Sequence, residues 1–145
     1  MSTPTLEAVN KNAIRHFLEV GDADTRDLQA IWDCFTPDCD FPTFAARTGK
    51  ATFTVEDYKG FLLAYLEALP DATFTPDQIV AEGDQVWVRI IIRGTHSAVL
   101  RGVPATGRPV EYTQLGMYTM RDGKIAEARA VFDDITLLHQ IGVQI

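Results

Sequence analysis

The chain has 145 residues, of which 46% are hydrophobic and 23% are charged, and its formal net charge is −7. This length and this balance predict one globular domain, residues 1–145, and argue against a disordered chain. The acidic charge argues against a nucleic-acid partner, because binding to phosphates needs a basic surface.

The sequence shows no segment typical of export or of membrane insertion. Residues 1–20 lack a basic start followed by a continuous apolar block, so we expect no signal peptide. No stretch approaches the ~18 to 20 apolar residues that a membrane span requires. The two cysteines, Cys34 and Cys39, lack a second cysteine pair and a nearby histidine, which favours free thiols over a metal site. We therefore expect a cytoplasmic protein with no metal ion and no membrane partner.

The first half of the sequence predicts three helices. Apolar residues at three-to-four spacing indicate the first helix, with Thr3 as its cap and Pro4 at its first position. Asp24 or Thr25 is expected to cap a second, shorter helix, and Thr54 is expected to cap a third. The stretch "TPDCDFPTF" between the second and third helices has the composition of turns.

The second half predicts four strands. The segments "TFTPDQIVAE" and "QVWVRIIIRGTH" flank the turn "EGD", whereas "PVEYTQLGMYTMR" and "KIAEARAVFD" flank "DG", a strong hairpin signal. Helices followed by a mostly antiparallel sheet predict an α+β fold. A strongly twisted sheet of this size curves, so three N-terminal helices over its concave face would leave a cone-shaped barrel with a pocket.

Alternating charges on the last predicted strand raise the main functional question. Glu127, Arg129 and Asp133 share one face, while small or apolar residues occupy the other. If the charged face lines the pocket, Asp133 can act as a general acid/base, and burial would raise its pKa. If that face is solvated, Asp133 is a surface charge or the cap of the helix that follows. Asp134 would point the opposite way, and we expect it to cap that helix.

Further candidates lie on other elements. His96 is either an acid at the pocket mouth or a residue that fixes the loop after its strand. Tyrosine hydroxyls can stabilise an enolate, although two tyrosines in one strand, Tyr112 and Tyr118, more often serve packing. Aromatic residues of the predicted helices are expected in the core and also as pocket wall: Trp32, Phe35 and Tyr65. The sequence has no dinucleotide, P-loop or esterase motif, which favours a cofactor-independent reaction on a small molecule.

Several short motifs occur in the second half of the chain. They are "GD-x-V-x-x-R", "RGTH", "G-x-P-A-T-G-R-x-V", "R-x-GKI-x-E" and "D-x-x-x-LL-x-Q-x-G". With these motifs, the sequence from Ile79 onward resembles the C-terminal half of SnoaL-like polyketide cyclases, and the earlier part resembles them in outline. These cyclases belong to the nuclear-transport-factor-2-like superfamily, whose domains are cone-shaped α+β barrels.

The resemblance implies an activity and a catalytic residue. Counted back from Gln140, the family's acid/base aspartate falls at Asp133 and not at Asp134. In cyclases of this family such a residue removes a proton next to a carbonyl, and the enolate closes a ring by intramolecular aldol condensation without a cofactor. The resemblance also implies a homodimer through the sheet face and a small hydrophobic or polar-aromatic ligand.

Arg129 departs from the family pattern, which usually has an aromatic residue at this position. The cation favours an anionic or strongly polar substrate or a different reaction, and Arg129 would orient the substrate or stabilise an oxyanion. Epoxide hydrolysis or dehydration in the same pocket is one alternative. It needs a second acid near Asp133, for which Asp40 and Glu127 are the candidates. The other alternative is a non-catalytic ligand-binding module, which predicts a solvated or backbone-bonded Asp133 with no groove beside it.

Overall fold

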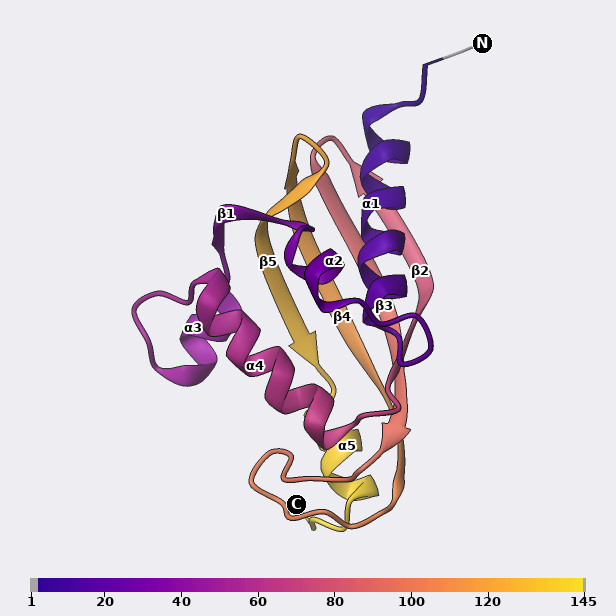
Figure 1. Cartoon of the computed structure of the whole chain (residues 1–145), viewed down its shortest axis with the longest axis vertical. Helices are drawn as coiled ribbons and strands as arrows, with labels where there is room; N and C mark the ends of the chain where they lie inside the picture. The colour runs from indigo at the N-terminus through magenta and orange to yellow at the C-terminus, as the bar shows by residue number, and fades with distance from the viewer. Residues whose placement is uncertain (1–2, 145) are drawn as a thin grey trace.

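The computed structural model describes residues 3–144. The predicted domain spans residues 1–145, so its first two residues and its last one lie outside the described part. Figure 1 shows how the helices and strands are arranged. Their bounds in chain order are α1 Leu6–Gly21, α2 Leu28–Trp32, β1 Phe35–Asp40, α3 Pro42–Thr48, α4 Val55–Ala68, β2 Thr73–Glu82, β3 Gln85–Thr95, β4 Pro109–Arg121, β5 Lys124–Phe132 and α5 Asp134–Gln140.

The strands of the described chain form one sheet in the order β1-β5-β4-β3-β2, with β1 and β2 at its edges. β1 pairs with β5 in parallel, whereas the other neighbouring strands pair antiparallel. The sheet twists and curves without closing on itself (Figure 1). The predicted α+β cone with a mostly antiparallel sheet is therefore confirmed, as an open rather than a closed barrel.

Both predicted hairpins are present. β4 and β5 are joined at Asp122 and Gly123, whose φ angles of 52° and 76° both lie in the left-handed region. Two positive φ angles in a row give a turn whose twist matches that of the flanking strands, which is why "DG" is a strong hairpin signal. The "EGD" turn between β2 and β3 likewise uses a positive φ, of 58°, at Gly83.

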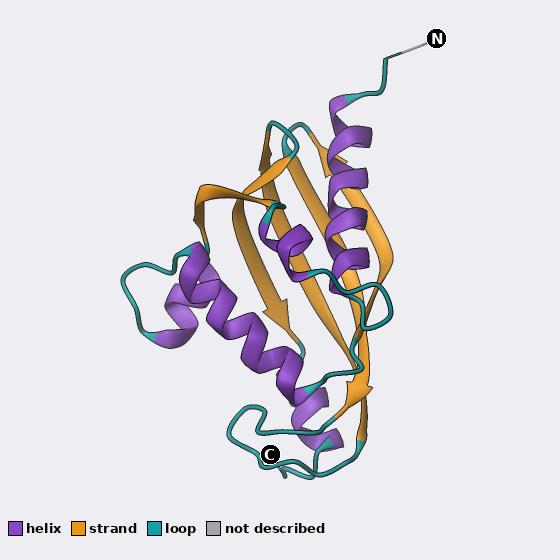
Figure 2. Ribbon diagram, viewed as in Figure 1, coloured by secondary structure: helices purple, strands orange, loops and turns teal. Residues whose placement is uncertain are grey.

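The helices lie on the concave face of the sheet and bury it. Figure 2 shows α1, α2 and α4 in front of the strands, and α1 packs against both β2 and β3. On β3 the inward residues Val86, Val88 and Ile90 are almost completely buried, whereas Trp87 between them is 49% exposed. Each buried aliphatic side chain of this kind contributes ~1.5 to 3 kcal/mol. The core therefore occupies the space between the helices and the inner face of the sheet.

The structure departs from the sequence prediction in the first half of the chain. Four helices, not three, precede the hairpins, and "FTPDCD" is a strand rather than part of a turn. This segment forms β1 because its pairing with β5 at the sheet edge outweighs the turn preference of Pro37 and Asp38. No helix within residues 3–144 combines the length and the apolar composition needed to cross a membrane.

Two of the predicted helix caps were wrong and one is confirmed. α1 is capped by Thr5 and not by Thr3, because the Thr5 side chain accepts a hydrogen bond from the Ala8 amide. α2 is capped by Asp27 rather than by Asp24 or Thr25, because the Asp27 side chain accepts a hydrogen bond from the Ala30 amide. α4 is capped by Thr54 as predicted, in a reciprocal pair of hydrogen bonds with Asp57.

Candidate functional site

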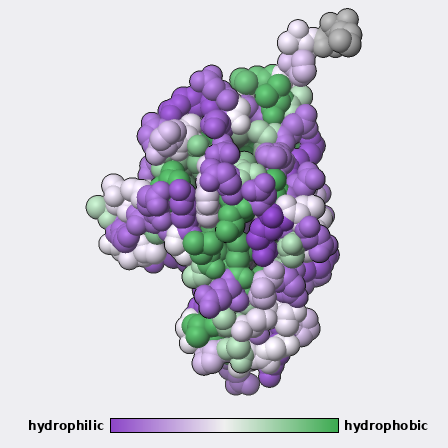
Figure 3. All heavy atoms as spheres, viewed as in Figure 1, coloured by the Kyte–Doolittle hydropathy of each residue, from purple (hydrophilic) through white to green (hydrophobic). Residues whose placement is uncertain are grey.

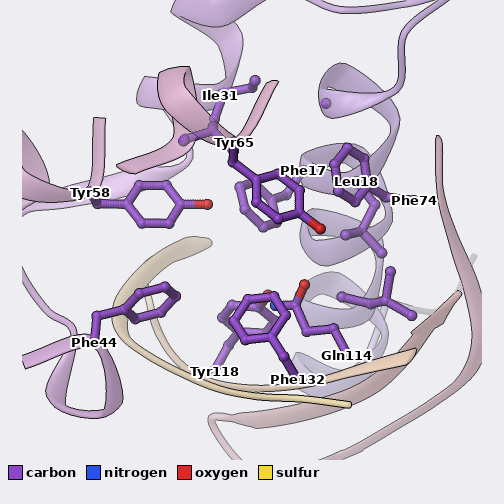
Figure 4. A pocket seen from close by; sticks show the side chains of 13 residues that line it. Phe17, Leu18, Ile31, Phe44, Tyr58, Tyr65, Phe74, Gln114, Tyr118 and Phe132 are labelled. Atoms are coloured by element: carbon purple, nitrogen blue, oxygen red, sulfur yellow. The ribbon is translucent and has the colours of Figure 1, made fainter. Parts of the chain in front are cut away.

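An apolar pocket lies between the helices and the inner face of the sheet. Its cavity volume is about 50 Å³. Aromatic rings make most of its wall, and Figure 4 shows them converging from several elements: Phe17, Phe44, Tyr58, Tyr65, Phe74, Tyr118 and Phe132. Figure 3 shows the molecule from the side on which the helices cover the sheet. Hydrophobic residues gather at the centre of this face, between hydrophilic surfaces on either side.

Small residues on β4 and β5 leave room for this pocket. Gly116 pairs with Ala130, and Tyr118 pairs with Ala128, in the β4–β5 register. A Cβ atom on Gly116 would lie 2.7 Å from the ring of Tyr118, so only glycine lets that ring lie across the inner face. A second, smaller pocket lies beside the first and is lined by some of these residues. The row of small side chains thus provides space that larger ones would fill.

The polar groups of the pocket are mainly phenols. Burial raises the pKa of Tyr58, Tyr65 and Tyr118 above the ordinary tyrosine value, so all three stay protonated and can donate a hydrogen bond. The Tyr65 hydroxyl also hydrogen-bonds the hydroxyl of the buried Tyr112. Figure 4 shows the Tyr58 hydroxyl pointing into the space between the pocket walls. Such donors can stabilise a carbonyl oxygen or an enolate.

A cluster of charges borders the pocket at Phe132. The Asp134 carboxylate accepts hydrogen bonds from Arg47 Nη2 at 2.6 Å and from Arg101 Nε at 3.1 Å. Both guanidinium groups also lie over the ring of Phe132, with distances of 5.4 Å and 5.3 Å from the Cζ atom to the ring centroid. Phe132 lines the pocket, so this cluster, Arg47–Arg101–Asp134, contacts the pocket wall, although its own side chains are not part of the lining.

Comparisons with known proteins show the family and the fold of the chain. The family model for SnoaL-like polyketide cyclases matches residues 11–141. The chain belongs to the SnoaL-like polyketide cyclase family. Among solved structures, IdmH from Streptomyces antibioticus, provisionally assigned as a polyketide cyclase, is 34% identical over 92% of this chain and 99% of its own, with a TM-score of 0.78. No match is found among curated proteins.

Two further structures resemble this SnoaL-like chain. AclR from Streptomyces galilaeus, provisionally assigned as a hydroxylase, is 25% identical over 94% of this chain and 82% of its own, with a TM-score of 0.82. A SnoaL-like protein from Jannaschia sp. CCS1 is 19% identical over 100% of this chain and 99% of its own, also with a TM-score of 0.82. At that identity the likeness shows the shared fold alone.

Asp133, the position that the family resemblance assigns to the acid/base, is exposed at the start of α5. Its carboxylate caps this helix by accepting hydrogen bonds from the Thr136 hydroxyl at 2.6 Å and from the Thr136 amide at 3.1 Å. These bonds lower the pKa of Asp133, opposite to the rise that we expected from burial. The capping role that we expected of Asp134 therefore belongs to Asp133. Its catalytic role stays a prediction.

The charged face of β5 lies outside the cone, so the expectation that it lines the cavity was wrong. The Arg129 side chain is 48% exposed and pairs with Glu127 at 2.9 Å, on the face opposite to Ala128 and Phe132. Arg129 borders the smaller pocket, but its guanidinium is directed to solvent and to Glu127. The inner face of β5 is the one with small and apolar residues, because these leave space for the rings of the pocket.

The second-acid candidates for epoxide opening lie far along the sheet from Asp133. Asp40 is paired with Glu127 in the β1–β5 register. Glu127 precedes Asp133 by six positions on an extended segment, a distance of roughly 20 Å at ~3.3 Å per residue. Neither carboxylate is therefore positioned to act together with Asp133. Within residues 3–144, no three His, Cys, Asp or Glu side chains are grouped closely enough to hold a metal ion.

The remaining predicted residues divide between the pocket and its supports. Tyr65 and Tyr118 line the main pocket, and Phe35 lines the smaller one; that they bind substrate stays a prediction. His96 is completely buried and holds the loop after β3 through Thr106 Oγ1 at 2.8 Å and the Val103 carbonyl at 3.2 Å, which is the loop-fixing alternative.

Four further residues remain to be placed. Trp32 is partly buried, with the Lys59 ammonium 5.5 Å from its ring centroid, and is not part of either pocket wall. The sequence patterns missed Arg47 and Arg101 as residues of the site. The inward position of Asp134 could have been predicted from the sequence, because Asp134 follows Phe132 by two residues and successive side chains of a strand alternate between its two faces.

Proposed function

We propose that this SnoaL-like protein is a cofactor-independent cyclase that acts on a small carbonyl compound in the aromatic pocket. A carboxylate removes a proton from the carbon next to a carbonyl, the resulting enolate carbon attacks a second carbonyl of the same molecule, and the new alkoxide takes a proton back. The observation that carries the proposal is a pocket of converging rings with protonated phenols, in a member of this family.

The phenols would supply electrostatic stabilisation. Negative charge moves to the carbonyl oxygen as the enolate forms, and a buried donor near that oxygen stabilises it more than water does. Tyr58 and Tyr118 are the first candidates, since both line the main and the smaller pocket. Tyr65 and Tyr112 act as a hydrogen-bonded pair, in which one hydroxyl can orient the other.

Two neighbouring carboxylates compete for the role of the base. Asp133 holds the family position, but it would have to leave Thr136 and turn inward. Asp134 contacts two arginines that lie over the pocket-lining Phe132, so it reaches the pocket with a smaller movement. We favour Asp134 on this geometry, and we keep Asp133 as the alternative that the resemblance supports.

An exchange experiment tests the proposal without knowledge of the substrate. The aromatic ketone 2-tetralone is incubated with the protein in D₂O, and loss of its α-proton signals is followed by NMR. A positioned base accelerates proton transfer by ~10² to 10⁴-fold, so we expect Asp134→Asn to lower the exchange rate by a factor in that range. Asp84→Asn, in the exposed β2–β3 turn, is the matched control and should leave the rate unchanged.

The outcomes separate the candidates. If Asp133→Asn, rather than Asp134→Asn, removes the acceleration, the family position is the base. If the wild type binds 2-tetralone and accelerates nothing, the second candidate function holds, a non-catalytic small-ligand-binding module. That candidate is favoured by one observation: Asp133 is exposed and bonded to a backbone amide, as such a module predicts.

We further propose that the protein forms a homodimer through the outer face of the sheet. Val80, Trp87 and Val131 are large hydrophobic residues exposed on this face, and Val80 pairs directly with Trp87. Monomeric proteins rarely expose a contiguous apolar patch of appreciable size. A second copy fits best, because a two-fold axis places the same patch on both sides of the interface.

A further inference from the structure

The Arg47–Arg101–Asp134 cluster carries an excess of positive charge. Two guanidinium groups share a single carboxylate at 2.6 Å and 3.1 Å, and no other ion pair of either arginine is present in residues 3–144. The cluster therefore has a net charge of +1, although the whole chain carries −7. A local cation at a pocket edge in an acidic protein attracts an anion to that point.

Arg101 is the inward member of the cluster. Its side chain is only 16% exposed, and its Nη2 atom is buried without a hydrogen-bond partner among the described residues. A buried donor that lacks a partner costs free energy, and such groups are rare in native proteins. The charge of Arg101 also acts on the pocket: it lowers the pKa of Tyr65, against the larger rise caused by burial.

The loop after β3 holds Arg101 in place. Arg101 itself has a left-handed φ of 51°, and Leu100 and Val103, which flank the turn formed by Arg101 and Gly102, are joined by two backbone hydrogen bonds of 3.0 Å and 2.9 Å. The buried His96 ring forms hydrogen bonds with Thr106 and with the Val103 carbonyl of this turn. A long surface cation would lose side-chain entropy on binding an anion. Arg101 is instead already held by its ion pair with Asp134 and is largely buried.

We infer that Arg101, assisted by Arg47, binds a carboxylate of the substrate, so that the substrate is an aromatic carbonyl acid rather than its neutral ester or amide. This inference rests on the proposed function, because it names the substrate class of the same pocket. The planar guanidinium fork matches a carboxylate in geometry and charge. The apolar body of the ligand would lie along Phe132 and Tyr65, next to the charged end.

Asp134 allows the inference to predict the direction in which the affinity for an anion changes. Its carboxylate occupies the Arg101 Nε–H and one Arg47 donor, in the manner of an internal competitor for the substrate carboxylate. Removing its charge raises the net charge of the cluster to +2. An anion should then bind more tightly, whereas a neutral molecule of the same shape should bind with unchanged affinity.

Two probes of equal shape and different charge test this, 2-naphthoate and 2-naphthamide, with dissociation constants measured by calorimetry. We expect the wild type to bind the carboxylate about 10-fold more tightly than the amide, the size of effect that one hydrogen bond to a charged group gives. Arg101→Gln should bring the ratio close to one and leave the amide unaffected. Arg101→Lys should keep part of the preference, and Asp134→Asn should increase it.

Arg89→Gln is the matched control, since Arg89 is an exposed arginine on the outer face of the sheet, pairs with Asp77 and lines neither pocket. It should leave both dissociation constants unchanged. Unchanged binding of the amide to Arg101→Gln shows in the same experiment that the variant is folded. Equal binding of the two probes to the wild type, a preference that survives Arg101→Gln, or no binding of either probe would overturn the inference.

The two experiments test the proposed function and the carboxylate site independently of each other. The exchange assay uses 2-tetralone, which carries no anionic group, so its rate reports on the base and on the phenols alone. A protein that exchanges 2-tetralone but binds both naphthalene probes equally keeps the cyclase proposal and loses the carboxylate site. A protein that prefers 2-naphthoate through Arg101 but exchanges nothing keeps the anion site in a binding module.

Discussion

Gly116 and Tyr118 lie two residues apart on β4, and a Cβ atom on Gly116 would come within 2.7 Å of the Tyr118 ring. The close contact fixes the ring across the inner face of the sheet, where Tyr118 lines both the main and the smaller pocket. The missing side chain at Gly116 therefore decides the shape of the pocket as well as the position of one of its donors.

Gly116→Ala should displace the Tyr118 ring and destabilise the protein. Forcing one extra carbon into a packed interior costs ~1 to 3 kcal/mol, which equilibrium urea unfolding would measure. Gly60→Ala is the matched control: its Cβ meets no atom within 4 Å on helix α4, and alanine is favoured over glycine in a helix by ~0.5 to 1 kcal/mol. Equal stability of Gly116→Ala and wild type would show that Tyr118 has room to move.

Asp133 should stabilise α5 as a helix cap. Asp133→Asn keeps an oxygen that can accept the Thr136 amide and should have nearly the wild-type unfolding midpoint, whereas Asp133→Leu loses the cap and should unfold at lower urea concentration. If Asp133→Leu is as stable as wild type or more stable, the carboxylate is not needed as a cap and a catalytic role gains support.

The same carboxylate predicts a pH dependence with a definite sign. The hydrogen bonds from Thr136 lower the pKa of Asp133 below its ordinary value of 3.8, so the unfolded chain binds its proton more readily. The stabilisation is therefore present above the ordinary pKa and is lost as the pH falls through the lowered one. The stability difference between wild type and Asp133→Leu should shrink below pH 3.8. A difference that grows on acidification would contradict this.

Asp133 and Asp134 also show how far the sequence could predict the site. Alternation along β5 correctly separated two faces, but it does not say which face is inward. The charged face was the more chemically suggestive one, yet a pocket needs small residues, and Ala128, Ala130 and Gly116 supply them. Arg101 left no pattern at all, because it depends on a loop conformation fixed by tertiary contacts of His96.

For the fold, the sequence predicted correctly those features that depend on one short segment of the chain. The "DG" turn and the Thr54 cap are confirmed, since both depend on neighbouring residues alone. β1 was missed, since its only sheet partner, β5, lies some eighty to ninety residues later in the chain, as the pairing of Phe35 with Ile125 shows. Long-range pairing of this kind overrides the turn preference of Pro and Asp in the segment.

The buried tyrosines should resist ionisation in the folded protein. Burial raises the pKa of Tyr58, Tyr65 and Tyr118, so the folded state holds protons that the unfolded state releases near pH ~10. Stability is fully present below the unfolded pKa and is lost as the pH rises through the folded pKa. Ultraviolet titration of phenolate should show little ionisation near pH ~10 in the native protein and complete ionisation in urea. Normal titration of all tyrosines in the native state would place them in contact with water.

Trp87 should be central to the proposed homodimer. It is the largest exposed apolar side chain on the outer face of the sheet, in register with Val80 on one side and Met117 on the other. Trp87→Lys would place two like charges across a two-fold axis and remove an aromatic anchor, so the dimer dissociation constant should rise by at least about 10-fold. Analytical ultracentrifugation measures it, with Lys59→Gln on the helical face as the control. A wild type that sediments as a monomer at all concentrations would contradict the dimer, whereas a dimer insensitive to Trp87→Lys would place its interface on another surface.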